Sequence, residues 1–219
     1  MTESPSPPSS LPDGPPDFLT DGLATAPLTF AFAHGAGAPM DTPFMTAFAE
    51  ALGARGWRVV RFEFPYMAKR RLDGKRRPPD RAPRLLACWQ AVIAALGPER
   101  LVIGGKSMGG RMASLVAEEA GVRGLACLGY PFHPAGKPER LRTEHLAALT
   151  VPTLILQGTR DSLGNRAEVE GYGLPPAIRL HWAEDGDHDL KPRKASGRSA
   201  EQNWQDAVEA LDGFLRSLA

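Results

Sequence analysis

The chain has 219 residues, of which 42% are hydrophobic and 23% charged, and its formal net charge is +1. This length suits one domain with a substantial buried core better than two full domains. The balanced charge argues against a protein built mainly to bind nucleic acid, and no apolar run approaches the roughly 20 residues needed to cross a bilayer.

The N-terminus is rich in proline and serine. Its sequence, MTESPSPPSSLPDGPPD, has neither a basic segment nor an apolar stretch, so it does not have the pattern of a secretory signal. This composition buries too little apolar surface to offset the entropy cost of ordering. We therefore expect about the first 17 residues to be mobile, and we divide the chain into a disordered tail over residues 1–25 and a single domain over 26–219.

The chain contains two cysteines, Cys88 and Cys127, which lie far apart in the sequence. Neither has neighbours that resemble a metal site. The pattern is typical of reduced, buried thiols in a cytoplasmic protein, although the sequence alone leaves a disulfide between them open.

From residue 27 onward, strand-like and helix-like patterns alternate. Helices are indicated by apolar residues at a spacing of three or four, as in Phe44, Phe48 and Leu52. Strands are indicated by short apolar runs. The expected strands are 28–33, 57–64, 100–103, 124–128, 153–156 and 178–182, and the expected helices are 43–55, 84–96, 108–120 and 202–218. This order predicts an α/β domain with a mostly parallel sheet and helices on both faces.

The segment Gly105-Lys106-Ser107-Met108-Gly109 lies between an expected strand and an expected helix. A Gly-x-Ser-x-Gly sequence in this context forms a sharp turn that exposes the serine hydroxyl, and the two glycines relieve crowding around it. The backbone N–H of Met108 is then free to donate to an oxyanion. We interpret Ser107 as a nucleophile; the alternative is a glycine-rich turn without a catalytic role.

A phosphate-binding loop is a further alternative, since Gly105-Lys106-Ser107 resembles the end of a Walker A motif. That motif requires a glycine five positions earlier, where this chain has Arg100. The intervening residues form an apolar strand rather than a loop. The nucleotide-binding interpretation is therefore poor.

A serine nucleophile needs a base, and the base needs a carboxylate to orient it. On this kind of scaffold the acid and the histidine follow the serine on loops after later strands. Asp161 follows the strand 153–156, and His188 follows the strand 178–182. Asp185, Asp187 and Asp189 are alternative acids, but they lie too close to His188 in sequence for the usual arrangement.

The glycine-rich loop over residues 34–38 (HGAGA) follows the first long strand. Its small residues allow the backbone to approach a reacting carbonyl, so we predict the Ala36 N–H as a second oxyanion donor. The candidate substrate contacts are His34, Gly35, Lys106 and His133. For three of them another role is favoured: His34 fixes the loop, Lys106 pairs with a carboxylate, and His133 lies at the surface.

Six segments together resemble one known family: HGAGAPMDTPFM, RFEFPYM, GGKSMGGR, GYPFHPAGKPERLRTEHL, PTLILQGTRD and GDHDLKPRK. They are similar to the bacterial dienelactone-hydrolase-like proteins of the α/β-hydrolase superfamily. Animal relatives of these proteins include a testis-expressed protein and a subunit of a histone acetyltransferase complex. The resemblance covers about residues 28–218. It implies an α/β-hydrolase fold with a minimal lid and with Ser107, Asp161 and His188 in the triad roles, but it implies no particular substrate.

Residues 69–84 (KRRLDGKRRPPDRAPR) carry eight Lys or Arg against Asp73 and Asp80, a local net charge of +6. We expect a loop here, at the same sheet edge as Ser107. A cationic rim attracts anionic substrates, which favours an ester or thioester that carries a carboxylate or phosphate. A solvated loop without this role is the alternative, and nucleic-acid binding is weaker because the patch has few interleaved aromatics.

The sequence thus predicts a serine hydrolase that acts on a small ester, thioester or related acyl substrate. No metal or organic cofactor is expected, because the three residues supply both base and nucleophile. The alternative is a catalytically silent α/β-hydrolase fold that binds a protein partner.

Overall fold

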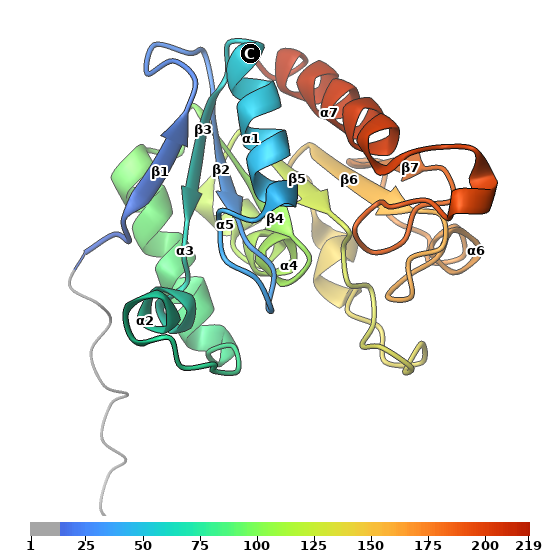
Figure 1. Ribbon diagram of the computed structural model, residues 1–219. Helices are drawn as coiled ribbons and strands as arrows, with labels where there is room; N and C mark the ends of the chain where they lie inside the picture. The colour runs from blue at the N-terminus through green and yellow to red at the C-terminus, as the bar shows by residue number, and fades with distance from the viewer. Residues whose placement is uncertain (1–13) are drawn as a thin grey trace, which may run out of the picture.

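A seven-stranded sheet forms the centre of the molecule in the computed structural model, which describes residues 14–219 (Figure 1). The strand order is β1-β3-β2-β4-β5-β6-β7. Every neighbouring pair is parallel except β1 and β3. The strands are β1 (Phe18–Asp21), β2 (Thr29–Ala33), β3 (Arg58–Phe62), β4 (Leu101–Lys106), β5 (Gly124–Leu128), β6 (Thr153–Gly158) and β7 (Ile178–Ala183).

Helices cover both faces of this sheet. The helices are α1 (Pro43–Ala54), α2 (Pro65–Asp73), α3 (Ala82–Leu96), α4 (Met108–Ser114), α5 (Ala117–Ala120), α6 (Arg166–Val169) and α7 (Ala200–Arg216), with short 3-10 turns at Glu144–Ala148 and Lys194–Ser196. Helices α1 and α7 lie on one face and α3 and α4 on the other (Figure 1). The predicted α/β fold, with a mostly parallel sheet between two helical layers, is confirmed.

The core is divided into two apolar clusters by the alternation of side chains along the strands. In β2, Phe30 and Phe32 pack toward α1 and α7, whereas Ala31 and Ala33 face the layer that contains Trp89 of α3. Because both faces of the sheet are buried, its central strands are mostly apolar along their length rather than alternating.

The expected elements are present with shifts of a few residues at their ends, but the helix expected over 108–120 is interrupted. The N–H groups of Leu115 and Val116 bond to the carbonyls three residues earlier, at Met112 and Ala113, instead of four. These tighter turns separate α4 from α5.

The prediction of a disordered tail up to residue 25 is wrong for residues 18–21, which form β1 at the sheet edge. Phe18 packs against the core, and Asp21 forms an ion pair with Arg61 at 2.9 Å. A four-residue edge strand carries too little periodicity to be recognised beside a proline-rich segment. The expectation for residues 1–13 lies outside the described residues.

The sequence analysis expected a continuous loop over residues 69–84, and this expectation is wrong because the first part of the segment belongs to α2. Pro65 begins this helix, and Gly74 ends it in a left-handed conformation with φ 69°. Helix α3 begins at Ala82, so the loop covers only residues 74–81. Within residues 14–219, no helix is both long and apolar enough to span a membrane.

Candidate active site

Ser107 lies on a strained turn between β4 and α4. Its backbone has φ 52° and ψ −116°, which is unfavourable for a residue with a side chain. A Cβ at Gly105 would lie 2.5 Å from the Ala33 carbonyl oxygen, and one at Gly109 would lie 2.5 Å from the His34 carbonyl oxygen. Only glycine fits at both positions, as the motif predicts.

The structure brings together the three residues that the sequence places in order after β4, β6 and β7. The Ser107 Oγ lies 2.8 Å from Nε2 of His188, and Nδ1 of the same ring lies 2.8 Å from Oδ2 of Asp161. Asp161 is fully buried, and the His188 side chain is 28% exposed. Because a carboxylate only accepts, Nδ1 carries the ring proton and Nε2 presents its lone pair to Ser107.

Asp161 is held by two further donors. The Leu163 N–H donates to its Oδ1 at 2.8 Å, and the Gln157 amide lies 3.0 Å from its Oδ2. Gln157 is itself fully buried at the end of β6, and its Oε1 accepts the Tyr130 N–H at 2.7 Å. The sequence analysis did not assign a role to Gln157; the available signal was a polar residue at the end of an apolar strand.

The alternative acids have other partners. Asp185 pairs with Arg193 and Arg160, and Asp187 accepts backbone N–H groups within its own loop. Asp189 pairs with Lys106 at 3.3 Å. Of these carboxylates and Asp161, the His188 ring contacts only Asp161.

Of the two predicted oxyanion donors, Met108 directly follows Ser107 and Ala36 belongs to the loop after β2. Met108 is the first residue of α4, so its N–H has no acceptor within the helix. Ala36 lines the same cleft as Ser107. The loop that contains Ala36 is braced by α2, since the Tyr66 hydroxyl donates to the Ala36 carbonyl at 2.9 Å and Arg70 donates to the Gly37 carbonyl at 3.3 Å. The sequence analysis did not predict these contacts, because it expected no helix over residues 65–73.

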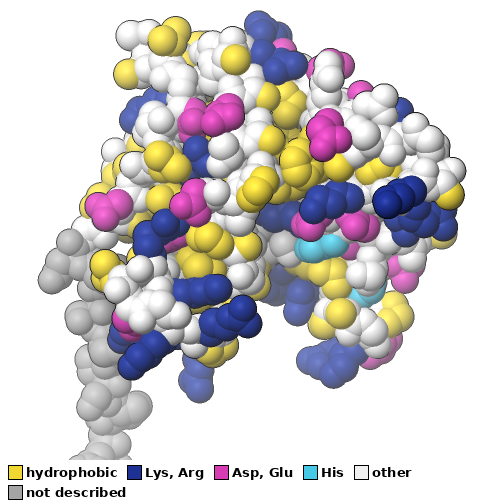
Figure 2. All heavy atoms as spheres, in the orientation of Figure 1, with side chains coloured by type: hydrophobic (Ala, Val, Ile, Leu, Met, Phe, Trp, Pro, Cys, Tyr) yellow, Lys and Arg dark blue, Asp and Glu magenta, His cyan; other side chains and the backbone are white. Residues whose placement is uncertain are grey.

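Ser107 and His188 open onto a cleft of about 440 Å³. Gly35, Phe44 and Trp204 contribute small or apolar surface, and the cations are Lys106 and Lys191. Figure 2 shows histidine atoms at this surface beside both acidic and basic side chains. A larger cavity of about 760 Å³ beside α2 and α3 is lined by none of the predicted site residues.

His34 does not contact this cleft, which corrects its assignment as a substrate contact. Its side chain is fully buried, Nδ1 donates to the Gly35 carbonyl at 2.7 Å, and Nε2 accepts the Phe64 N–H at 3.1 Å. Burial lowers the pKa of this imidazole. His34 therefore fixes the glycine-rich loop, the role that the sequence favoured.

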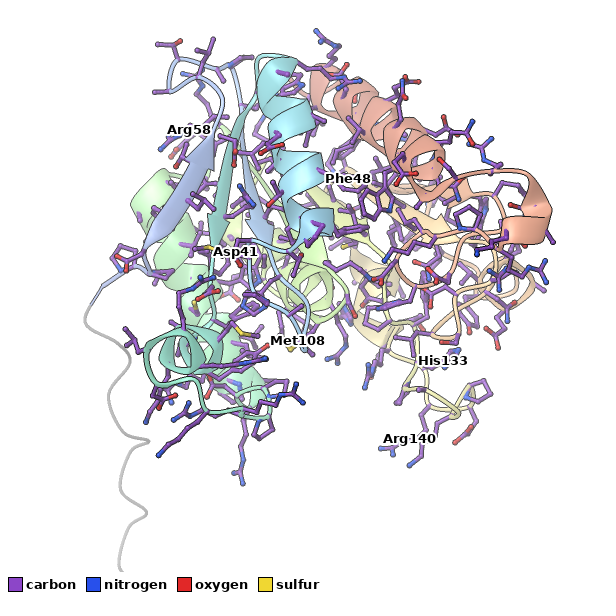
Figure 3. All side chains as sticks on the ribbon, in the orientation of Figure 1. Asp41, Phe48, Arg58, Met108, His133 and Arg140 are labelled. Carbon is purple, nitrogen blue, oxygen red and sulfur yellow. The ribbon has the colours of Figure 1, made fainter. Side chains whose placement is uncertain are left out.

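His133 is likewise removed from the cleft and is not at the surface. It is 2% exposed, and its ring lies 2.9 Å from the Pro134 carbonyl oxygen and 3.4 Å from a carboxylate oxygen of Glu168. Figure 3 shows it well apart from Met108. Neither predicted role, substrate contact or surface residue, fits this position.

Lys106 forms the carboxylate pair that the sequence favoured, and it also lines the cleft. Its ammonium lies 3.3 Å from Asp189 and donates to the main-chain carbonyl of His188 at 2.5 Å. Burial lowers the pKa of Lys106, and the negative charge of Asp189 opposes this effect.

A family model described as "Alpha/beta hydrolase domain" matches residues 26–216. The chain belongs to the α/β-hydrolase family.

Solved α/β-hydrolase structures share the fold at low sequence identity. A serine hydrolase from Xanthomonas campestris, described as lacking a lid, is 22% identical, with a TM-score of 0.68 over 94% of this chain and 91% of that chain. A serine hydrolase homologue from Coxiella burnetii is 18% identical, with a TM-score of 0.67 over 92% and 91%. Est1E from Butyrivibrio proteoclasticus, with ferulic acid bound, is 16% identical, with a TM-score of 0.69 over 92% and 94%.

In this α/β-hydrolase chain the connection from β5 to β6, over residues 129–152, contains only the 3-10 turn Glu144–Ala148. The longer connection from β3 to β4, over residues 63–100, contains α2 and α3. The β5–β6 connection agrees with the predicted minimal lid and leaves the cleft beside Ser107 open.

Proposed function

We propose that this protein is a serine hydrolase that cleaves a small ester, thioester or related acyl substrate through an acyl-enzyme intermediate. The observation that carries the proposal is the continuous hydrogen-bonded series from Asp161 through His188 to Ser107, which ends at a cleft of about 440 Å³. A cleft of this volume is in the usual range for small-molecule sites.

The first half-reaction forms the acyl-enzyme. The Ser107 Oγ attacks the substrate carbonyl carbon while its proton moves to Nε2 of His188, and Asp161 stabilises the resulting imidazolium. The tetrahedral intermediate then expels the alcohol or thiol, which takes the proton from His188. In the second half-reaction His188 deprotonates water, the water attacks the acyl carbon, and Ser107 regains its proton as the acid leaves.

The negative oxygen of both tetrahedral intermediates needs fixed donors. We assign this role to the backbone N–H groups of Met108 and Ala36. The strained turn at Ser107 and the brace from Tyr66 to the Ala36 carbonyl support the assignment, because both limit the movement of the backbone that carries the donors. Preorganised donors of this kind stabilise developing charge without reorganisation during the reaction.

We extend the proposal to an acyl substrate that carries a carboxylate or phosphate. Lys106 and Lys191 both line the cleft, with Asp189 as an acidic partner for each. The basic residues of α2 and the following loop lie at the same end of the sheet (Figure 1).

Steady-state esterase kinetics on p-nitrophenyl acetate test the proposed reaction. We expect Ser107→Ala and His188→Ala to lose at least about 10³-fold in kcat. Ser114→Ala is the matched control, since Ser114 also lies 2.8 Å from a histidine, His145, but this ring has no carboxylate partner among residues 14–219. An inactive, folded wild-type protein would contradict the proposal and favour a silent protein-binding module. Activity that is lost in Ser114→Ala but retained in Ser107→Ala would also contradict it.

A further inference from the structure

We propose that Lys106 is a positioning residue that holds His188 in register with Ser107. This inference rests on the proposed function. Lys106 is the last residue of β4 and directly precedes Ser107, so the nucleophile and the lysine share one rigid strand end. Its ammonium reaches across the sheet edge and donates to the His188 carbonyl at 2.5 Å. The residue before the nucleophile thus binds the main chain of the base.

The loop that carries His188 is bonded to α7, because Asn203 donates to the Glu184 and Leu190 carbonyls and Trp204 donates to the Asp189 carbonyl. Within the loop, Asp187 accepts the N–H groups of Asp189 and Lys191, and Leu190 adopts a left-handed conformation with φ 61°. These contacts shape the loop and hold it against α7, but none of them joins it to the end of β4 that carries Ser107. Within the described part of the chain, the hydrogen bonds of His188 itself go to Ser107, Asp161 and Lys106.

Those three bonds have different consequences. The bonds to Ser107 and Asp161 act on the imidazole, which is free to rotate about two side-chain torsions. The bond from Lys106 acts on the main chain and limits the position from which the imidazole extends. Since displacement of a reacting group by about 1 Å can cost about 10²-fold in rate, a fixed main chain matters for proton transfer.

Gly129 provides the space for this contact. It has φ +62°, and a Cβ there would lie 2.7 Å from the His188 carbonyl oxygen, 3.0 Å from the Lys106 Nζ and 3.3 Å from the His188 Nδ1. The ammonium, the carbonyl and the imidazole therefore meet at a position where only glycine fits. This close packing favours one geometry for the lysine rather than a mobile side chain.

Burial strengthens the contact between the Lys106 ammonium and the His188 carbonyl. The Lys106 side chain is 10% exposed, compared with 50% for Lys191, which lines the same cleft. A buried ammonium requires compensating acceptors, and the His188 carbonyl and the Asp189 carboxylate supply them. Loss of the ammonium would leave the His188 carbonyl without this partner.

The test compares Lys106→Met and Lys106→Arg with wild-type protein on p-nitrophenyl acetate. A neutral ester removes any contribution of Lys106 to binding a substrate anion. We expect Lys106→Met to lose about 10- to 100-fold in kcat, with KM changed by no more than about twofold. Lys106→Arg retains a donor and should recover part of this loss. Lys194→Met, at an exposed position outside the cleft, serves as the control.

A proton NMR spectrum gives a second readout that a purely structural role would not change. The Nδ1 proton between His188 and Asp161 should give a far-downfield signal in wild type that broadens in Lys106→Met. If Lys106→Met does not fold, Lys106→Gln is measured in the same way. A kcat within twofold of wild type in the folded variant, or an increase in KM alone, would overturn the inference. Inactive wild-type protein would instead overturn the proposed function.

Discussion

The buried carboxylate of Asp161 depends on Gln157 for one of its hydrogen bonds. The Gln157 amide nitrogen lies 3.0 Å from Asp161 Oδ2 and 3.0 Å from the Gly164 carbonyl, and the Leu163 N–H satisfies the other carboxylate oxygen. Hydrogen bonds to the charged form offset the cost of removing a carboxylate from water. The chain order predicts Asp161 as the partner of His188, whereas Gln157 was not identified because its partners come from two separate segments, Tyr130 and the loop over 161–164.

Asp185 gives a prediction about acid stability. Hydrogen bonds from Arg193, with Arg160 nearby, lower the pKa of this carboxyl from 3.8 to about 2. The folded state therefore binds this proton less readily than the unfolded chain. The stabilisation by Asp185 is complete above about pH 4 and is lost as the pH falls through about 2.

Urea unfolding of wild type and Asp185→Asn across this range measures the effect. We expect the variant to be less stable at about pH 6, and we expect the difference to shrink steadily below about pH 4. An equal difference at about pH 6 and about pH 2 would show that the substitution acts through packing rather than through charge.

At the scale of the elements, the turn from β4 to α4 is the most constrained part of the site. A Cβ at Gly105 would lie 2.5 Å from the Ala33 carbonyl oxygen and 2.9 Å from backbone atoms of Gly109 and Gly110. All of these atoms are backbone, so none can move without a shift of β2 or α4. The turn was predicted from sequence because each glycine has a steric reason that the motif itself expresses.

Gly105→Ala should destabilise the fold by about 1–3 kcal/mol, since the added methyl group overpacks the turn. Gly213→Ala in α7 is the matched control, because a Cβ there meets nothing within 4 Å and the helix favours alanine by up to about 1 kcal/mol. Thermal unfolding of both variants measures the contrast. Equal melting temperatures for the two variants would contradict the steric account of this turn.

Among the elements that the sequence analysis did not predict, β1 and α2 were missed for different physical reasons. Strand β1 has only four residues, and it is held by pairing with β3 and by the ion pair between Asp21 and Arg61, both of which are distant in sequence. Helix α2 was not predicted because its charged residues Lys69, Arg70 and Arg71 are typical of a solvated loop. In the structure Arg71 pairs with Glu63 and Asp41, which gives these charges defined partners.

At the scale of the whole molecule, the basic residues do not form a uniform cationic rim. Lys and Arg side chains gather on the lower part of the face in Figure 2, where α2 lies in Figure 1. Several are paired with neighbouring acids, and the pairs are Arg71–Glu63, Arg77–Asp73 and Arg84–Asp80. The sequence gives the total charge of this segment correctly, but the pairing that reduces its field depends on the fold.

The remaining positive charge leads to a prediction about ionic strength. We expect kcat/KM for a carboxylated acyl ester to fall severalfold between low salt and about 0.5 M salt, because screening weakens attraction over more than about 10 Å. The neutral ester of the same acyl group should change little. Equal salt dependence for the two esters would exclude steering by these residues and leave the proposed reaction intact.

The central claim is that Ser107 is a nucleophile activated by His188. Its most direct measurement is mass spectrometry of the protein after reaction with a fluorophosphonate probe. We predict one covalent adduct per chain on the peptide that contains Ser107, no adduct in Ser107→Ala, and much slower labelling in His188→Ala. An unmodified Ser107 in folded wild-type protein, or an adduct that persists in Ser107→Ala, would contradict this account.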